Sequence, residues 1–503
     1  MTRTDNPPDR PGFRIQPSPV PGWPKLAWLA ELPDGSDTIR LLHGPGVEAT
    51  DRWAAEAVWC GDFDAGDFDR TDRLFGSGVR IRGRSVVFCC SGTIMDRLWL
   101  RRSDGRLLVS NSLAALCAVA DVMVRDDREF RADTMTVWGS PDSTRTFPVS
   151  SGEVTVAWFC NLVWRDGRIT PQPKPDTAPA FRTYGDYVGF LVDSARLLGE
   201  NIRSAARKAK VTPMAAVSNG YDSPAVAWVV RHAGCEKAVT FSRCTSFWRG
   251  SDSGADIARR LGMTCRTFPT RAREYPHELA VWAACGRPSM LSLSLLEYPE
   301  PLSAVFLGNW GDSAWATVRS PYPYRFIDLG MGELRLWVGA LQCVIPFWGA
   351  RHQRELDVIT FAREMDPWRL GGSYDRPIAR RIVEEAGIPR GGFAVRKKDT
   401  SHEEPFLWPY SPRLRQNLAK YLQGRGMTAP PDWKIALLRG VATAEKLLYR
   451  NLLRKLGVTR RVRPWSGYAP RDLLVRWANE ELSRAYRDAL SPAGPVGADR
   501  AGR

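Results

Sequence analysis

The sequence contains no Cys-x-x-Cys pair, although ten cysteines are scattered over its 503 residues. Zinc sites and disulfide frameworks depend on patterned cysteines, so we expect neither, and reduced thiols in a cytoplasm fit best. The chain also shows no apolar run long enough to cross a bilayer and no signal peptide. We therefore expect a cytoplasmic protein without a membrane segment.

The residues that are present are typical of a globular protein. With 44% hydrophobic and 25% charged residues, the chain is long enough for two or three domains. The net charge of +16 is uneven, because residues 351–503 hold 30 Lys and Arg against 17 Asp and Glu, which leaves +13 there. Such a region is compatible with nucleic acid, with an anionic nucleotide and pyrophosphate, or with a solvated surface.

The most informative stretch surrounds Asp222. An apolar run at 213–217 predicts a buried strand, and residues 225–230 predict a helix, which Ser223 should cap. The turn between them is rich in hydroxyl groups. Its backbone N–H groups lie at the positive end of the helix, where they can bind an anion. Asp222 would repel a bare phosphate, so the turn predicts a phosphate that carries Mg²⁺.

This turn lacks the Gly-Lys-Ser/Thr of a Walker loop. It reads Ser-Asn-Gly-Tyr-Asp-Ser and resembles the Ser-Gly-Gly-x-Asp-Ser loop of the ATP pyrophosphatases, specifically the synthetase domain of asparagine synthetase. Asn219 replaces the second-position Gly, and Asn tolerates left-handed backbone. The resemblance implies ATP and Mg²⁺ as cofactors, with metal binding by Asp222 and ATP contacts from Ser218, Asn219, Gly220 and Ser223. The alternative is an ordinary strand-to-helix turn.

The chain then alternates between the two element types. Residues 237–242 predict a strand, 253–261 a helix and 264–268 a strand. This order predicts a parallel sheet with helices on both faces and ligands at the carboxyl ends of the strands. In the resembling family the end of the second strand faces adenine, which makes Ser242 an ATP-binding candidate with Arg243 beside it.

A second strand-to-turn stretch, 304–313, resembles the Ser-Gly-Glu-Gly-x-Asp-Glu motif of asparagine synthetases. Gly308 and Asp312 match it, whereas Asn309 and Ser313 replace the two Glu residues. The resemblance implies a pyrophosphate contact from Gly308 and a second metal ligand in Asp312. The alternative is an Asp that caps a helix.

Arg396-Lys397-Lys398 resembles the Arg-x-Lys loop at the end of the same domain. In that family the Lys lies on the reacting carbonyl and the phosphates, where a fixed cation stabilises developing charge. The spacing implies Lys398 as the catalytic residue and Lys397 as the neighbouring alternative. A solvated basic loop is the other interpretation.

The front of the chain predicts a meander of strands over 78–116 followed by a helix at 112–119. Over about 60–170 it resembles the glutaminase domain of asparagine synthetases. The nucleophile of those glutaminases is an N-terminal Cys, whereas this chain begins Met1-Thr2-Arg3, so we expect a degenerate domain. Five cysteines are expected to be buried apolar residues, namely Cys60, Cys89, Cys90, Cys117 and Cys160.

The expected fold class is α/β, with a parallel-sheet ATP-pyrophosphatase domain preceded by a smaller α+β glutaminase-like domain. Six segments are predicted in order: a disordered tail (1–24), the glutaminase-like domain (25–170), a linker (171–184), the synthetase-like domain (185–425), a basic helical extension (426–490) and a tail (491–503). The extension should bury its leucines, namely Leu437, Leu447, Leu448, Leu452, Leu453 and Leu456.

The function implied by the resemblance is that of an ATP-dependent, AMP-forming carbon–nitrogen ligase. It would adenylate a small-molecule carboxylate, release pyrophosphate and form an amide with an amine, without its own glutamine hydrolysis. One alternative is a tRNA-modifying ATP pyrophosphatase, which the basic final third favours and the lack of a zinc knuckle disfavours. Another is an inactive nucleotide-binding protein, suggested by Asn219 and Ser313. A homo-oligomer is compatible with the sequence.

Overall fold

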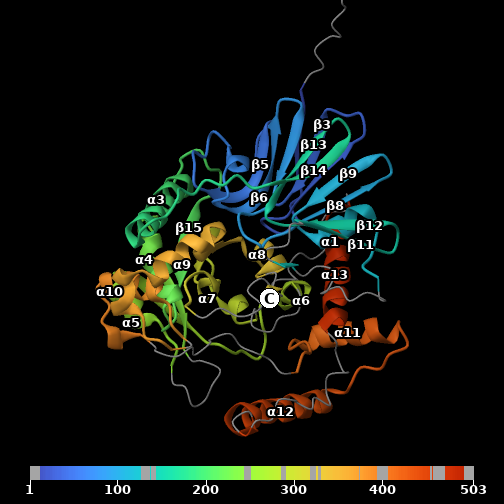
Figure 1. The fold of residues 1–503 in the computed structure, drawn as a ribbon. Coiled ribbons are helices and arrows are strands. Elements are labelled where there is room, and N and C mark those ends of the chain that lie inside the picture. Colours follow the sequence, from blue (N-terminus) through green and yellow to red (C-terminus); the bar gives the residue numbers. More distant parts are fainter. Residues whose placement is uncertain are drawn as a thin grey trace, which may run out of the picture.

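The computed structural model describes residues 12–125, 136–137, 143–242, 251–284, 291–317, 325–326, 330–372, 374–393, 406–453, 456 and 471–491. These residues form a mixed α/β structure with several sheets, one of which is entirely parallel (Figure 1). None of the described helices is both long and apolar enough to cross a membrane.

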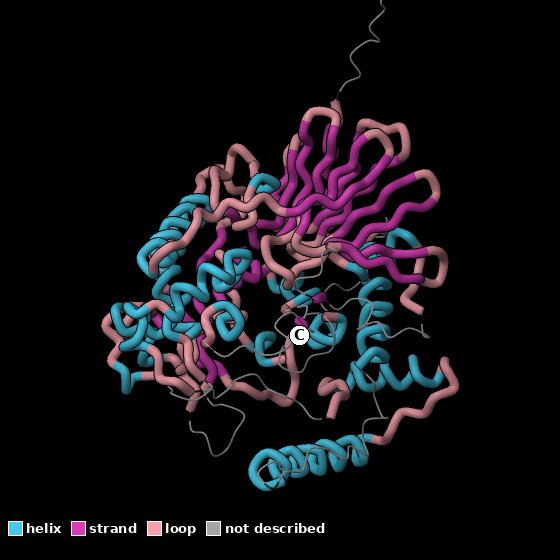
Figure 2. Tube along the Cα trace, viewed as in Figure 1, coloured by secondary structure: helices cyan, strands magenta, loops and turns pink. Residues whose placement is uncertain are grey.

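The front half folds into two sheets that lie face to face (Figure 2). Strand side chains alternate between the faces of a sheet, and the inner faces meet in a core that includes Trp28, Phe88 and Trp164. One sheet has the order β1 (Arg14–Pro19), β3 (Thr38–His43), β2 (Trp28–Pro33), β9 (Arg106–Ser110), β8 (Leu98–Ser103), β12 (Glu153–Ala157) and β11 (Thr144–Pro148). The other has the order β14 (Arg168–Pro173), β13 (Cys160–Arg165), β7 (Ser85–Cys89), β6 (Leu74–Arg82), β5 (Trp53–Trp59) and β4 (Glu48–Ala49).

Two expectations about the boundaries of this half do not hold. The predicted tail over 1–24 contains strand β1, which pairs in parallel with β3 and buries Ile15 in the core. The predicted linker also starts later, because Pro171 and Pro173 lie in β14. Since β14 is an edge strand, one of its sides makes no ladder hydrogen bonds, and proline is tolerated there. The start of the chain, Met1-Thr2-Arg3, which differs from the N-terminal Cys of the glutaminases, lies outside the described residues.

The outer face of the seven-stranded sheet is covered by one helix, and a second helix from the other end of the chain packs beside it. The helix predicted at 112–119 is confirmed as α1 (Leu113–Ala120), and the Ser112 hydroxyl caps it by accepting the Ala115 amide at 3.1 Å. Beside α1 lies α13 (Arg471–Asp488), which also contacts α6 (Glu278–Ala283) of the back half. The last helix of the expected extension is therefore built into the body of the protein.

The back half is organised around the predicted parallel sheet, which is confirmed. Its order is β17 (Thr264–Phe268), β16 (Lys237–Phe241), β15 (Val211–Ala216), β18 (Leu302–Leu307) and β20 (Ala340–Val344). The helices that flank its first strands are α3 (Tyr184–Ile202), α4 (Asp222–Arg231) and α5 (Ala255–Arg260). The chain leaves the central strand β15 toward β16 and later returns on the other side as β18. Ligands of such sheets bind where the direction of winding reverses, at the carboxyl ends of these two strands.

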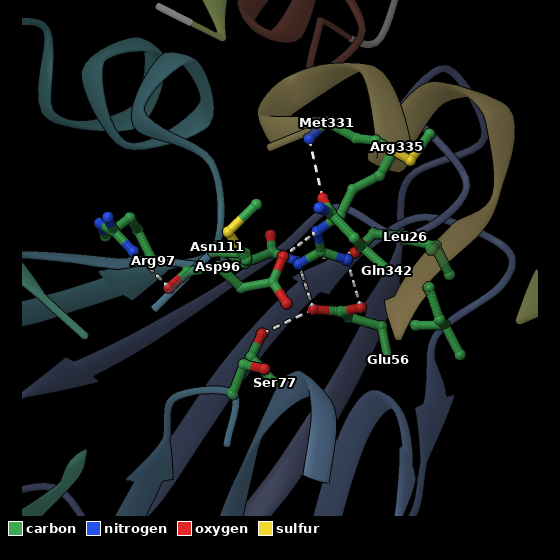
Figure 3. A network of polar contacts seen from close by, with 12 residues as sticks. Leu26, Glu56, Ser77, Asp96, Arg97, Asn111, Met331, Arg335 and Gln342 are labelled. Carbon is green, nitrogen blue, oxygen red and sulfur yellow. Dashed lines mark hydrogen bonds and ion pairs between the residues drawn. The ribbon is translucent and has the colours of Figure 1, made fainter. Parts of the chain in front are cut away.

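A buried ion cluster joins the two halves (Figure 3). Arg335 of α8 (Gly332–Val338) donates hydrogen bonds of 2.7 and 2.9 Å to Glu56 of β5, and its Nε lies 2.6 Å from Asp96. The side chains of all three residues are at most 3% exposed. Because buried charges need partners, these contacts hold the front sandwich against the sheet behind it.

The remaining elements complete the back half and the C-terminal region. They are β10 (Thr136–Val137), which pairs with β19 (Arg325–Phe326), and the helices α7 (Gly311–Ala314), α9 (Gln353–Phe361), α10 (Pro377–Glu385), α11 (Pro412–Gln423) and α12 (Asp432–Leu448). Helix α12 lies at the margin of the molecule, away from the sheets (Figure 1). The expected burial of its leucines is wrong, because Leu437, Leu447 and Leu448 are exposed, as are Leu452 and Leu456 beyond it.

Candidate functional site

The turn between β15 and α4 is closed by its two serines. The Ser218 amide donates to the Ser223 hydroxyl at 2.8 Å, and the two hydroxyl oxygens are also 2.8 Å apart. The Gly220 amide donates to the Ser218 hydroxyl at 3.4 Å. Helix α4 begins at Asp222, so Ser223 lies inside its first turn and closes the loop instead of capping the helix as predicted. The first amides of α4 remain at the positive end of a ten-residue helix.

The second predicted motif lies directly against this turn. Strands β15 and β18 pair in parallel, with Ala215 opposite Phe306, so their following loops leave the same edge of the sheet. A Cβ atom added at Gly308 would lie 2.6 Å from the Ser223 backbone nitrogen, and one added at Gly311 would lie 2.5 Å from the Asp222 carboxyl carbon. The two motifs, far apart in sequence, therefore share one junction that only glycine allows.

The backbone of the second loop is unusual. Trp310 adopts the left-handed conformation with φ of 74°, which is rare for a bulky residue. The buried ring of Trp310 packs on Phe347 with a centroid separation of 4.9 Å, and this contact holds the strained turn. Strain of this kind concentrates at functional sites. The turn leaves Asp312 exposed at the start of α7.

Asp222 forms an ion pair that the sequence did not reveal. Its Oδ2 accepts a hydrogen bond from Nη1 of Arg376, while its Oδ1 is buried and accepts no hydrogen bond from any described residue. Both side chains are largely enclosed, at 16% exposure for Asp222 and 6% for Arg376. Burial lowers the pKa of Arg376 to about 10, so it remains a cation at neutral pH. Asp222 is therefore held as a neutralised carboxylate, and its second oxygen has no hydrogen-bond partner among the described residues.

An aromatic and cationic cap covers the turn. The Tyr374 ring stacks on Tyr221 at 5.0 Å, and Arg376 lies over the outer face of Tyr374 at 4.6 Å. Arg380 lies 4.7 Å over Tyr221 and donates to its hydroxyl at 2.7 Å. Phe393 meets Tyr221 edge-on at 5.0 Å. All the capping residues come from 374–393, a segment about 150 residues beyond the turn.

The Tyr374 hydroxyl lies directly above Gly220, because a Cβ atom there would be 2.9 Å from it. Burial raises the pKa of Tyr374, and the nearby Tyr221 and the carboxylates of Asp252 and Asp312 raise it further. The hydroxyl is therefore neutral at physiological pH and available as a hydrogen-bond donor. Two carboxylates, one from the segment before α5 and one from the start of α7, therefore lie near one phenol.

The segment before α5 also contacts the turn. The Asn219 amide donates to the Asp252 carbonyl at 2.9 Å, and Ser218 forms a β-bridge with Ser253. Ser242, the predicted adenine contact, is exposed and donates its amide to the Phe268 carbonyl at the end of β17. It lies on the same edge of the sheet, but Asp252 is the residue that contacts Asn219.

The structure thus brings together Ser218, Asn219, Gly220, Asp222, Ser223, Gly308 and Asp312 at one edge of the parallel sheet. Lys397, Lys398 and Arg243 lie outside the described residues. Sequence reasoning missed Tyr374, Arg376, Arg380 and Asp252. The signal available for two of them was the one-turn spacing of Arg376 and Arg380 at the start of an amphipathic helix.

A group of three or more His, Cys, Asp or Glu residues that could hold a metal unaided does not occur among the described residues. A comparison of the sequence with protein-family models finds no match, and a comparison with curated proteins finds none either. The geometry of this site is therefore the basis for a function.

Proposed function

We propose that this chain is an asparagine synthetase-like, ATP-dependent synthetase that adenylates a carboxylate, releases pyrophosphate and forms an amide. The observation that carries this proposal is the contact of Gly308 and Gly311 with Ser223 and Asp222. Two loops that resemble two motifs of one family meet at the reversal point of a parallel sheet. A chance resemblance at either loop would not require them to touch.

The chain's own groups suit a polyphosphate. The first amides of α4 lie at the carboxyl edge of the parallel sheet, and the Ser218–Ser223 hydrogen bonds hold the turn in place before any ligand arrives. The absence of side chains at Gly308 and Gly311 lets the second loop pack directly on the start of α4. Arg376 and the α4 amides would then face the negative charge that grows on the phosphates, and preorganised cations and dipoles lower the cost of that charge.

Mg²⁺ fits the two acidic residues. Mg²⁺ is commonly bound through one or two protein carboxylates together with substrate phosphates. Asp222 offers the Oδ1 atom that lacks a hydrogen-bond partner among the described residues, and Asp312 offers an exposed carboxylate on the opposing loop. The ion would share Asp222 with Arg376 and would supply further charge neutralisation. Lys398, from the sequence, remains the proposed cation on the reacting acyl group.

Glutamine hydrolysis is not part of the proposal. A glutaminase nucleophile acts as a thiolate. Burial raises the pKa of Cys60 and of Cys117 to about 12, and it also raises the pKa of Cys89. These thiols stay protonated at neutral pH, and their burial agrees with the role of apolar core residues. The nitrogen would come from an amine substrate.

The second candidate is a nucleotide-binding protein without catalysis. It is favoured by the ion pair between Asp222 and Arg376, which occupies one oxygen of the predicted metal ligand, and by the Tyr374 hydroxyl above Gly220. Such a protein would bind MgATP and leave it intact.

The experiment is to incubate the protein with MgATP labelled at the α-phosphate and with panels of amino acids, small carboxylic acids and amines. The synthetase proposal expects labelled AMP and an equal amount of pyrophosphate with at least one carboxylate. MgATP binding without AMP on any panel would favour the second candidate. Formation of ADP, or no binding of MgATP, would overturn both.

A further inference from the structure

The solvent-facing side of α12 is entirely apolar. After Asp432, the first residue of the helix, its exposed residues are Trp433, Ala436, Leu437, Gly440, Val441, Ala444, Leu447 and Leu448. A surface helix normally turns its polar side to water, so this arrangement is the reverse of the expected one. Leu452 and Leu456, just beyond the helix, are exposed as well.

The orientation of α12 is fixed by its opposite side. Ile435 and Ala442 are buried, and Arg439 donates to the carbonyls of Trp408 and Pro409 while lying over the Tyr410 ring at 3.9 Å. Asp432 pairs with Arg415 of α11 at 3.0 Å. These contacts attach the helix to its own chain and point its apolar side away from it. Figure 1 shows α12 at the margin of the molecule, in agreement with these contacts.

Small residues run along the middle of this apolar side. Ala436, Gly440 and Ala444 are spaced four apart, so they form one line on the helix surface. A Cβ atom added at Gly440 would meet nothing within 4 Å in its own chain. Leu437 and Val441 lie on one side of this line of small residues, and Leu447 lies on the other side. A line of small residues between larger ones lets a second helix approach closely.

We propose that α12 is a dimerisation helix, which packs antiparallel against α12 of a second copy of this chain about a two-fold axis near Gly440. A two-fold interface brings the same patch of both subunits together. In this arrangement Gly440 faces the partner's Gly440, and Ala436 faces the partner's Ala444. Trp433 packs beside the partner's Leu447, outside the line of small residues.

The charges on α12 favour the antiparallel direction. Lys434 and Glu445 lie on the same flank of the helix, about three turns apart and symmetric about its middle. An antiparallel pair centred near Gly440 brings each Lys434 beside the partner's Glu445. A parallel pair would instead place these flanks on opposite sides of the seam, so Lys434 and Glu445 would form no pair across it.

The exposed area is what a dimer of ordinary size requires. The seven large apolar residues of this face, from Trp433 to Leu456, are exposed by 40 to 68%. They present roughly 700 Å² per chain, above the 300–600 Å² patch common on monomers, and two such faces would bury roughly 1,400 Å². A lipid surface is a poorer occupant, because two of the three basic residues of α12 face the chain itself. Arg439 donates to the Trp408 carbonyl and Lys446 is buried, and the small residues at the centre of the face have little to insert.

Sedimentation equilibrium of the full chain tests the proposal, which does not depend on the proposed function. The wild-type protein should be a dimer. Leu437→Glu and Gly440→Leu should each weaken association by roughly 10- to 100-fold, the first by burying a charge and the second by filling the central line. Leucine is a better helix former than glycine, so Gly440→Leu leaves α12 intact. Val358→Glu, at a residue that is 67% exposed on α9, is the control and should leave the dimer unchanged.

A charge reversal and an engineered disulfide test the direction and the axis. Lys434→Glu should weaken association, and adding Glu445→Lys should restore it. Gly440→Cys should form a disulfide-linked dimer under mild oxidation, whereas Val358→Cys should not. A monomeric wild-type protein, or a dimer that survives both Leu437→Glu and Gly440→Leu, would overturn the proposal. A monomer that binds phosphatidylserine vesicles through the same face would overturn it in favour of a lipid surface.

Discussion

Arg335 and Glu56 meet fork to fork, with guanidinium–carboxylate distances of 2.7 and 2.9 Å, although 279 residues separate them in sequence (Figure 3). Ser77 donates to the same carboxylate at 2.7 Å, and Asn111 at 3.2 Å. Asp96 adds a second carboxylate to the one guanidinium. Arg335 is therefore the cation that neutralises both carboxylates of this junction. The junction is buried, so water cannot solvate the carboxylates in its place.

Replacing Arg335 with Leu should lower the free energy of unfolding by about 3–5 kcal/mol, because it leaves two carboxylates buried without their cation. Urea unfolding monitored by circular dichroism measures the change. Glu300→Gln is the matched control, since it removes an exposed ion pair with Lys25 and should cost less than about 1 kcal/mol. Equal effects of the two variants would contradict a structural role for the cluster.

Glu333 gives the junction a dependence on pH. Burial raises the pKa of Glu333 from 4.5 to about 6, even though Tyr486 and Ser112 donate to it. The folded protein therefore holds this proton more tightly than the unfolded chain, and the free energy of unfolding falls by about 2 kcal/mol as pH rises from about 4.5 to about 6. Glu333→Gln should lack this loss. Its stability relative to wild type should thus improve across that window, and a difference that stays flat with pH would refute the assignment.

The contact between the two loops predicts a severe effect of Gly308→Ala. The new methyl group would lie 2.6 Å from the Ser223 backbone nitrogen, which cannot rotate away. We expect a loss of about 1–3 kcal/mol in stability and weaker MgATP binding. Isothermal titration and thermal unfolding measure both. Gly391→Ala, which meets nothing within 4 Å, is the control and should leave both unchanged.

Asp312→Asn should reduce MgATP-dependent pyrophosphate release while leaving the unfolding temperature unchanged, because the side chain is exposed and its proposed role is to bind Mg²⁺. Asp256→Asn, at an exposed position of α5, provides the control. Wild-type turnover in the Asp312 variant would remove this residue from the site.

Lys398→Ala should lower the turnover number by roughly 10²–10³ and change MgATP affinity little, since a cation that acts on the transition state affects kcat more than binding. Lys397→Ala should do much less. Pyrophosphate release against ATP concentration separates the two effects. If Lys397 carries the loss, the Arg-x-Lys spacing identified the wrong neighbour.

The sequence predicted the features that local patterns specify. The strands at 237–242 and 264–268, the helix after Ser112 and the two glycine-bearing turns all follow from periodicity and turn chemistry within a few residues. The pairing of the turns also followed, because parallel strands place their carboxyl ends at one edge.

The features that sequence reasoning missed depend on residues that are distant in the sequence or, for the proposed dimer, on residues of a second chain. Tyr374 and Arg376 reach the phosphate turn only through tertiary folding, so no local pattern could assign them to it. The leucines of α12 predicted a core because an apolar helix face has the same sequence whether it packs on its own chain or on another. Ser223 was assigned to the cap because the helix was expected to begin two residues later than it does.

The position of α13 also has a consequence for the order in which the protein can be made. Helix α1 is covered by α13, which a ribosome would synthesise about 350 residues later, or roughly 20–70 s at ordinary elongation rates. During that interval the nascent front sandwich would expose the side of α1 that α13 later covers. The packing of the front half is therefore complete only after the last helix has been synthesised. A chaperone that shields α1 during translation would increase the yield of folded protein.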